Sequence, residues 1–144
     1  DGKLTWPPEI DIFDSPINGK EDRENMLHLG AIPSGAPRRI LEHDPRFELR
    51  WRNFIAPYSL RERWLETGAE WTKDKVCYFV DGERVMCEAY LWQHRDGRSA
   101  PPGHILLNLA IGGEWAGRHG IDDDKFPVRL SVDHVRVYEK RVGR

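Results

Sequence analysis

The fold of this chain is decided by the stretch Trp6-Pro7-Pro8-Glu9-Ile10-Asp11-Ile12-Phe13-Asp14, in which three carboxylates are interleaved with apolar residues after a proline pair. In an extended strand, successive side chains point to opposite faces. Glu9 and Asp11 therefore share one face, while Ile10 and Ile12 share the other and can enter a core. The stretch predicts a half-buried β-strand with an acidic outer face.

Asp14 stands out of phase with the other two acids. A β-bulge near Ile12-Phe13 would return Asp14 to the acidic face, and bulges are common next to active sites. Like charges that face each other across a sheet are unfavourable, so this row is a poor choice for stability alone. Two readings stay open at this point: a solvated outer face of an antiparallel sheet, or a row of carboxylates suited to glycoside cleavage.

The length of 144 residues suits one domain with one core, over residues 1–144. The 22 basic residues nearly balance the 24 acidic ones, which speaks against a nucleic-acid partner. No long apolar run predicts a membrane span, and no signal peptide is recognised. Because the chain begins with Asp1-Gly2-Lys3 and enters its first expected strand by about Glu9, we expect that an upstream segment has been removed.

Two cysteines flank a hairpin signal, Asp81-Gly82, in the stretch KVCYFVDGERVMCE. A two-residue turn would place Cys77 opposite Met86, whereas a three-residue loop with a bulge would place it opposite Cys87. A cross-strand disulfide and two free thiols both remain open. A disulfide would favour an oxidising compartment.

Further strands are expected along most of the chain. The continuous apolar run of 104–111 predicts a strand covered on both faces, and a phase slip in 128–138 predicts a bulge at Asp133-His134. Long helical periodicity is absent, so the pattern is that of an all-β sandwich or part of one. The expected strands are 8–14, 24–30, 47–54, 66–72, 75–80, 83–89, 104–111 and 128–138.

Four stretches, taken in order, resemble motifs of glycoside hydrolase family 16, which includes laminarinase-like β-1,3-glucanases. They are WPPEIDIFD, EWTKDKVCYFVDG, HILLNLAIGGEWAG and FPVRLSVDHVRVY. The resemblance covers nearly the whole chain and implies a concanavalin-like β-jelly-roll sandwich whose concave sheet forms a glycan cleft. The family's domain normally has further strands before the first motif. We therefore expect a C-terminal portion of the domain, incomplete at its N-terminal side, that pairs with a complementary N-terminal half.

The resemblance also assigns catalytic roles through the family pattern E-x-D-x-x-E. Glu9 would be the nucleophile of a retaining glycosidase, Asp11 would hold and tune its neighbours, and Asp14 would occupy the acid/base position. Asp14 stands where the family has Glu. Retaining enzymes hold the two carboxyls about 5–5.5 Å apart, and losing one methylene retracts the carboxyl by about 1.5 Å. A misplacement of about 1 Å can cost on the order of a hundredfold in rate.

Other candidate positions each have a plain structural alternative. The Gly-rich loop residue Trp115 resembles the family tryptophan that stacks on a sugar ring, against a role as a loop anchor. Trp6 would border the cleft or pack in the core. Asn108 would line the cleft or make a structural hydrogen bond. His28 resembles a histidine on the strand beside the catalytic one, where it would bond a carboxylate or the leaving-group sugar, or else have a structural partner.

Catalysis of this kind needs no cofactor, but Asp133 resembles a position that binds a structural Ca²⁺ in many relatives. The first function expected is an endo-acting β-glycoside hydrolase on a β-1,3-glucan-type polysaccharide, secreted or periplasmic. Two alternatives are a glycan-binding protein in which Asp14 impairs catalysis, and an inactive fragment that needs its N-terminal half.

Overall fold

The structure is a computed structural model that describes residues 6–18, 20–21, 23–32, 39–61 and 63–140. The chain divides into two compact units, Asp1–Ile105 and Leu106–Arg144, and each is described separately. The single domain expected over 1–144 stays a prediction. No helix in the described part of the chain has the length and apolar character needed to cross a membrane.

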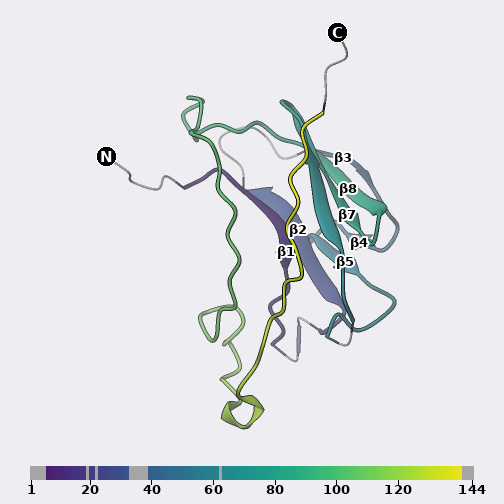
Figure 1. Ribbon diagram of the computed structural model, residues 1–144, viewed down its shortest axis with the longest axis vertical. Helices are drawn as coiled ribbons and strands as arrows, with labels where there is room; N and C mark the ends of the chain where they lie inside the picture. The colour runs from purple at the N-terminus through teal and green to yellow at the C-terminus, as the bar shows by residue number, and fades with distance from the viewer. Residues whose placement is uncertain (1–5, 19, 22, 33–38, 62, 141–144) are drawn as a thin grey trace. The chain divides into compact units, whose positions relative to one another are not determined.

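The first unit contains a four-stranded antiparallel sheet that carries the acidic stretch (Figure 1). Its strand order is β1-β2-β5-β4. The strands are β1 (Glu9–Asp14), β2 (Met26–Ile32), β5 (Asn53–Ile55) and β4 (Phe47–Glu48). The acidic strand β1 is therefore at one end of this sheet, with β2 as its neighbour.

A second four-stranded sheet in the same unit has the order β3-β8-β7-β6. The strands are β3 (Arg39–His43), β8 (Glu83–Ala89), β7 (Lys75–Val80) and β6 (Thr67–Trp71). All the pairings are antiparallel. Together the two sheets confirm the all-β class and are consistent with a β-jelly-roll sandwich.

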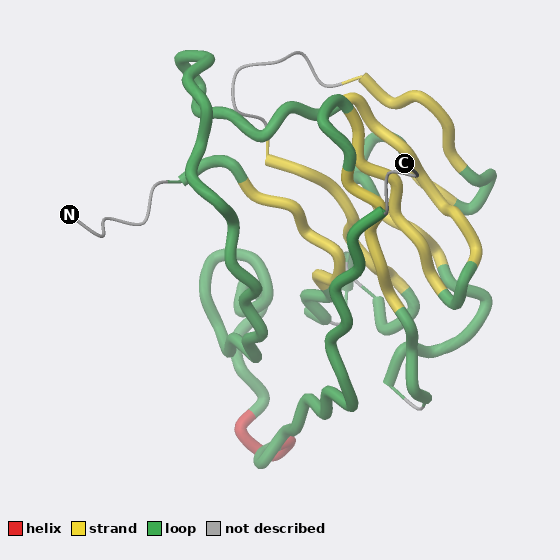
Figure 2. Tube along the Cα trace, turned by 45° about the horizontal axis from the view of Figure 1, so that its top comes forward, coloured by secondary structure: helices red, strands yellow, loops and turns green. Residues whose placement is uncertain are grey.

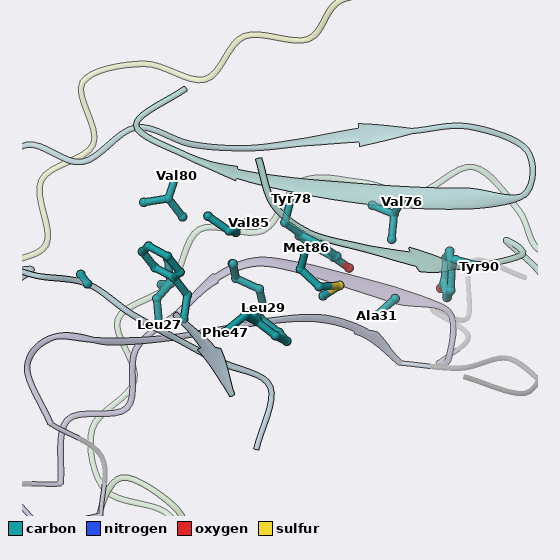
Figure 3. Close-up of a cluster of buried hydrophobic side chains, with 12 residues drawn as sticks. Leu27, Leu29, Ala31, Phe47, Val76, Tyr78, Val80, Val85, Met86 and Tyr90 are labelled. Carbon is teal, nitrogen blue, oxygen red and sulfur yellow. The ribbon is translucent and has the colours of Figure 1, made fainter. Parts of the chain in front are cut away.

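The hydrophobic core of the first unit lies between the two sheets (Figure 3). From β2, alternate residues Leu27, Leu29 and Ala31 are buried, as period-two patterning requires. From the other sheet, Tyr78 and Met86 are fully buried against them. Because odd-numbered residues of β2 enter the core, His28, Gly30 and Ile32 point to the opposite face of the first sheet.

The hairpin β7–β8 combines features of the two alternatives that the sequence left open, because it has a two-residue turn and also a bulge. Val80 pairs with Glu83, so Asp81 and Gly82 form a two-residue turn, and both have positive φ values of 49° and 78°. A bulge between Tyr78 and Phe79 then shifts the register. Cys77 consequently pairs with Cys87, and the two form a disulfide with a sulfur–sulfur distance of 2.01 Å.

The strand predictions succeed for the first unit, apart from two details. The expected strand 47–54 is two short strands, β4 and β5, separated by a turn, and the strand β3 was not predicted. Among the described residues all the strands lie before residue 90, and the part beyond it is loop with one isolated bridge between Gln93 and Ser99 and one short helical turn, Asp123–Lys125 (Figure 2).

The strands predicted at 104–111 and 128–138 are wrong for the chain as it stands. Both stretches lack a hydrogen-bonded partner strand among the described residues, and a strand exists only in a ladder. Their apolar side chains are exposed, for example Leu106 at 76% and Val137 at 80%. Without a ladder the predicted bulge at Asp133-His134 has no meaning, and the double coverage expected for 104–111 is not present.

Candidate active site

The register of β1 against β2 brings the three acids to one sheet face. Glu9 pairs with Ile32, Asp11 with Gly30 and Asp14 with His28. Directly paired residues share a face, and all three partners are residues that point away from the core. The register shifts between Asp11 and Asp14, so the bulge predicted there is confirmed. The acidic face is defined here as the outer face of β1 that carries Glu9, Asp11 and Asp14.

The same bulge corrects one expectation about the inner face of β1. Ile10 pairs with Ala31 and packs against the core, as predicted. Ile12 is 39% exposed and Phe13 is 44% exposed, so the prediction that Ile12 enters the core is wrong. The extra residue of a bulge leaves the ladder and its side chain loses the regular inward direction.

Glu9 is held by contacts at both its side chain and its backbone. The indole N–H of Trp6 donates a hydrogen bond to the Glu9 carboxylate. The Tyr90 hydroxyl lies 3.3 Å from the carbonyl oxygens of both Glu9 and Ile32, to which it donates. Burial is the main cause that raises the pKa of Tyr90 to about 12, so this hydroxyl keeps its proton. Trp6 is 62% exposed and lies beside Glu9 rather than in the core.

A transverse row of polar residues crosses the first sheet at Asp14. His28 is the backbone partner of Asp14 on one side and of Asn53 on the other, and Asn53 also pairs with Glu48. Asn53 is only 2% exposed, and its Oδ1 atom has no hydrogen-bond partner in the structure. The sequence analysis missed Asn53, although an amide within the apolar stretch Asn53–Ile55 was a signal of the same kind as Asn108.

A buried ion pair lies at the edge of β2 next to this row. Glu88, which is 1% exposed, forms an ion pair with the Arg52 guanidinium at 2.6 Å and accepts a hydrogen bond from the Ala31 backbone N–H at 2.8 Å. The Tyr78 hydroxyl donates to the same carboxylate oxygen at 3.1 Å. Burial is the main cause that raises the pKa of Tyr78 well above its usual range. Sequence reasoning missed this network, because its members are far apart in the chain.

Three of the predicted site residues lie in the second unit. Trp115, which is 39% exposed, belongs to a series of turns stabilised by backbone hydrogen bonds such as Gly117 N–H to Gly112 O. Asn108 is exposed in a loop. The Asp133 carboxylate lies 2.8 Å from Nδ1 of His134. Within the described residues no group of three or more His, Cys, Asp or Glu side chains could hold a metal ion. The calcium role of Asp133 stays a prediction.

The arrangement can support acid–base and nucleophilic chemistry on a ligand lying along β1. Three carboxyl groups share one outer face, one of them is held by an indole donor, and an imidazole lies next to the third. Two surface hollows of the first unit, about 400 and 620 Å³, have other linings, which include Trp71 and Trp92 for one and Arg23 and Tyr58 for the other.

The fold and the acidic face define a two-sheet all-β protein with a bulged row of carboxylates on one sheet. Comparison with known proteins then gives its relatives. The chain is 38% identical over 155 residues to a β-glucanase of Rhodothermus marinus, and the alignment covers 95% of this chain and 53% of the relative. It is homologous to this β-glucanase over nearly its whole length, in agreement with the resemblance to glycoside hydrolase family 16.

Two further relatives match about half of the chain. The clotting factor G alpha subunit of Tachypleus tridentatus is 36% identical over 72 residues, which is 49% of this chain and 10% of the relative. Glucan endo-1,3-beta-glucosidase A1 of Niallia circulans is 30% identical over 78 residues, which is 49% of this chain and 11% of the relative. No family model matches the chain. No solved structure matches it significantly. The chain spans about half of the Rhodothermus relative and less of the others.

Proposed function

We propose that this chain carries the catalytic strand of an endo-acting, retaining β-glucan hydrolase that acts on a β-1,3-glucan-type polysaccharide. The observation that carries the proposal is the bulge in β1, which places Glu9, Asp11 and Asp14 on one outer face. The names of the Rhodothermus and Niallia relatives, a β-glucanase and a glucan endo-1,3-beta-glucosidase, support the substrate class.

In this mechanism Glu9 attacks the anomeric carbon and forms a covalent glycosyl-enzyme, while Asp14 protonates the leaving oxygen. Asp14 then removes a proton from the water that hydrolyses the intermediate. The Trp6 indole N–H orients the Glu9 carboxylate, and Tyr90 holds the backbone of the same residue. Asp11 lies between the two reacting acids and shapes their electrostatics.

The sharpest test is the release of reducing ends from laminarin by wild type and by matched carboxylate variants. Glu9→Gln is expected to abolish turnover and to leave glycan binding largely intact, because the amide keeps the shape but is not a nucleophile. Glu70→Gln removes an exposed carboxylate from β6 of the other sheet, outside the candidate site, and should leave turnover unchanged. Retained activity in Glu9→Gln would overturn the assignment.

A second candidate function is glycan binding without efficient cleavage. Asp14 favours it, because a carboxyl shortened by about 1.5 Å sits poorly for proton transfer. The clotting factor G alpha subunit, whose name is not that of a glycosidase, also shares this type of sequence. In this case laminarin binds without turnover, and Asp14→Glu gains activity.

The partners and the location follow from the same proposal. The substrate is a polysaccharide, and a complementary N-terminal half of the domain would supply partner strands for 104–111 and 128–138, whose apolar side chains are exposed. The Cys77–Cys87 disulfide favours an oxidising location, either secreted or periplasmic. Asp133 would be the chain's contribution to a structural Ca²⁺ site. A calcium titration followed by thermal unfolding tests that contribution, with Asp133→Asn as the comparison.

A further inference from the structure

Gly30 lies directly opposite Asp11 on the acidic face, and another residue fills the space that its missing side chain leaves. A Cβ atom built on Gly30 would lie 2.5 Å from Nε and 2.9 Å from Nη2 of Arg52. The guanidinium therefore occupies the position of a side chain at Gly30. Directly paired side chains in an antiparallel sheet have Cβ atoms about 4.5–5.5 Å apart. The Arg52 guanidinium, which comes from the turn before β5, thus lies over β2 at the position paired with Asp11.

The Arg52 guanidinium is held in this place by contacts with the other sheet. Glu88, on β8 of the other sheet, pairs with it at 2.6 Å, and the Glu88 carboxylate is itself held by the Ala31 N–H and the Tyr78 hydroxyl. Arg52 reaches the spot from a backbone with φ of 58°, a conformation that a non-glycine residue adopts rarely. Such strain persists where the surrounding structure imposes it, and it clusters at functional sites.

The Arg52 guanidinium also has a donor that Glu88 does not meet. Its Nη2 atom lies 2.6 Å from the Glu88 carboxylate, whereas its Nε atom is buried and has no hydrogen-bond partner among the described residues. Buried donors of this kind call for an explanation beyond packing.

We propose that Arg52 is a positioning residue of the candidate active site, whose guanidinium, anchored by Glu88, is the fixed positive charge that holds the Asp11 carboxylate ionised between Glu9 and Asp14. The charge placement is independent of what the protein does, while its catalytic consequence rests on the proposed function. The other charged or titratable groups around Asp11 are Glu9 and Asp14 on β1, His28 on β2, and Glu88, Tyr78 and Tyr90 from the core side.

The first test follows the side-chain carboxyl carbon of Asp11 by NMR as the pH is lowered. Removing an adjacent cation disfavours the ionised form, so the titration midpoint of Asp11 should rise by about 1 unit or more. Because Arg52→Met alone leaves Glu88 buried and unpaired, the double variant Arg52→Met/Glu88→Gln is compared with Glu88→Gln. The difference between these two isolates the charge of Arg52.

Gly30→Ala is a second test of the same charge, and it removes no charged group from the protein. Its Cβ would collide with Nε and push the guanidinium aside, so the Asp11 midpoint should rise by a smaller amount. Gly68→Ala on β6 is the matched control, because a Cβ there meets nothing within 4 Å. It should leave the midpoint unchanged. Arg52→Lys keeps the charge and should restore most of the wild-type midpoint.

The catalytic consequence has its own readout. Where laminarin turnover is measurable, the acid limb of the kcat profile should move to higher pH by the same amount as the Asp11 midpoint, in Gly30→Ala but not in Gly68→Ala. An Asp11 midpoint that does not move in either the double variant or Gly30→Ala would overturn the proposal. Failure of turnover alone would count against the hydrolase function and leave the NMR test valid.

Discussion

At the scale of single residues, one inserted position in β1 decides which carboxylates can act together. Without the bulge between Asp11 and Asp14, strict alternation would turn Asp14 to the opposite face. The price is an Ile12 side chain that is 39% exposed. The bulge therefore costs apolar burial and brings three carboxylates to one face. This exchange favours a functional site over core stability.

Trp6 gives a prediction at this scale. Trp6→Phe keeps an aromatic ring but removes the N–H that bonds the Glu9 carboxylate. A typical hydrogen bond contributes about 1 kcal/mol, so kcat/KM on laminarin should fall about fivefold.

The control is Trp51→Phe, at a tryptophan that is 61% exposed in the turn between β4 and β5. It should leave kcat/KM unchanged. Equal losses in the two variants would mean that the indole N–H of Trp6 has no particular role.

The acids of the site could be predicted from the sequence because they are close together in the chain. The Glu9, Asp11 and Asp14 pattern needs only period-two geometry and one bulge. Arg52, Asn53 and Glu88 could not be found in this way, since they meet β1 only through the pairing of β2 with β5 and the packing of β8. Contacts between distant parts of the chain are set by topology, which local patterns do not encode.

At the scale of elements, the hairpin β7–β8 shows how a turn signal and a bulge jointly set a register. The Asp81-Gly82 turn was predictable, because both positions need positive φ. The register shift between Tyr78 and Phe79 leaves Val85 of β8 as the extra residue, and Val85 and Met86 are both buried in the core.

The disulfide that this register allows should contribute measurably to stability. Cys77 and Cys87 are ten positions apart, and a cross-link that closes such a loop stabilises by about 2–4 kcal/mol, chiefly through the unfolded chain. Urea unfolding of the Cys77→Ala/Cys87→Ala variant should show a lower midpoint with a similar slope. An unchanged midpoint would show that the cross-link adds nothing to stability.

A second prediction at this scale concerns the turn before β4. Arg46 bonds the Asp44 carboxylate at 2.8 and 3.0 Å and reaches Glu83 of the β7–β8 hairpin at 2.7 Å. The side-chain hydrogen bond from Arg46 is the main cause that lowers the pKa of Asp44 from 3.8 to about 2.

The sign of its pH dependence follows from that direction. Because the folded state favours the ionised form, the contribution of Asp44 is fully present above about pH 4 and is lost as the pH falls towards 2. The difference in unfolding free energy between wild type and Asp44→Asn should therefore be constant above pH 5 and shrink below pH 4. A difference that grows with acidity would contradict the assignment.

At the scale of the whole molecule, the sequence predicts more sheet than the chain forms. The stretches 104–111 and 128–138 have strand patterning and exposed apolar side chains such as Leu106 and Val137, yet the described residues include no ladder for them. The alternation of apolar residues shows that a stretch is suited to a strand. It does not show whether a partner strand is present. The all-β class was predictable, whereas the pairing state of these two stretches was not.

Amide hydrogen exchange measures this difference directly. Amides in 106–111 and 128–138 should exchange at nearly unprotected rates in the 144-residue chain, because they lack ladder hydrogen bonds among the described residues. Amides of β2 and β7, which lie in the core, should be protected by about a thousandfold or more. Equal protection in the two sets would show that the later stretches already have partners.

The central claim is that Glu9 is a nucleophile on an open acidic face, and trapping the glycosyl-enzyme tests it most directly. A 2-deoxy-2-fluoro-β-laminaribioside with a dinitrophenyl leaving group needs no protonation of that group, so the shortened Asp14 cannot mask the result. If Glu9 is the nucleophile, the peptide containing Glu9 should carry one covalent sugar, and the Glu9→Gln variant should carry none. A label on Asp14 or elsewhere, or an unlabelled protein that still cleaves laminarin, would contradict it.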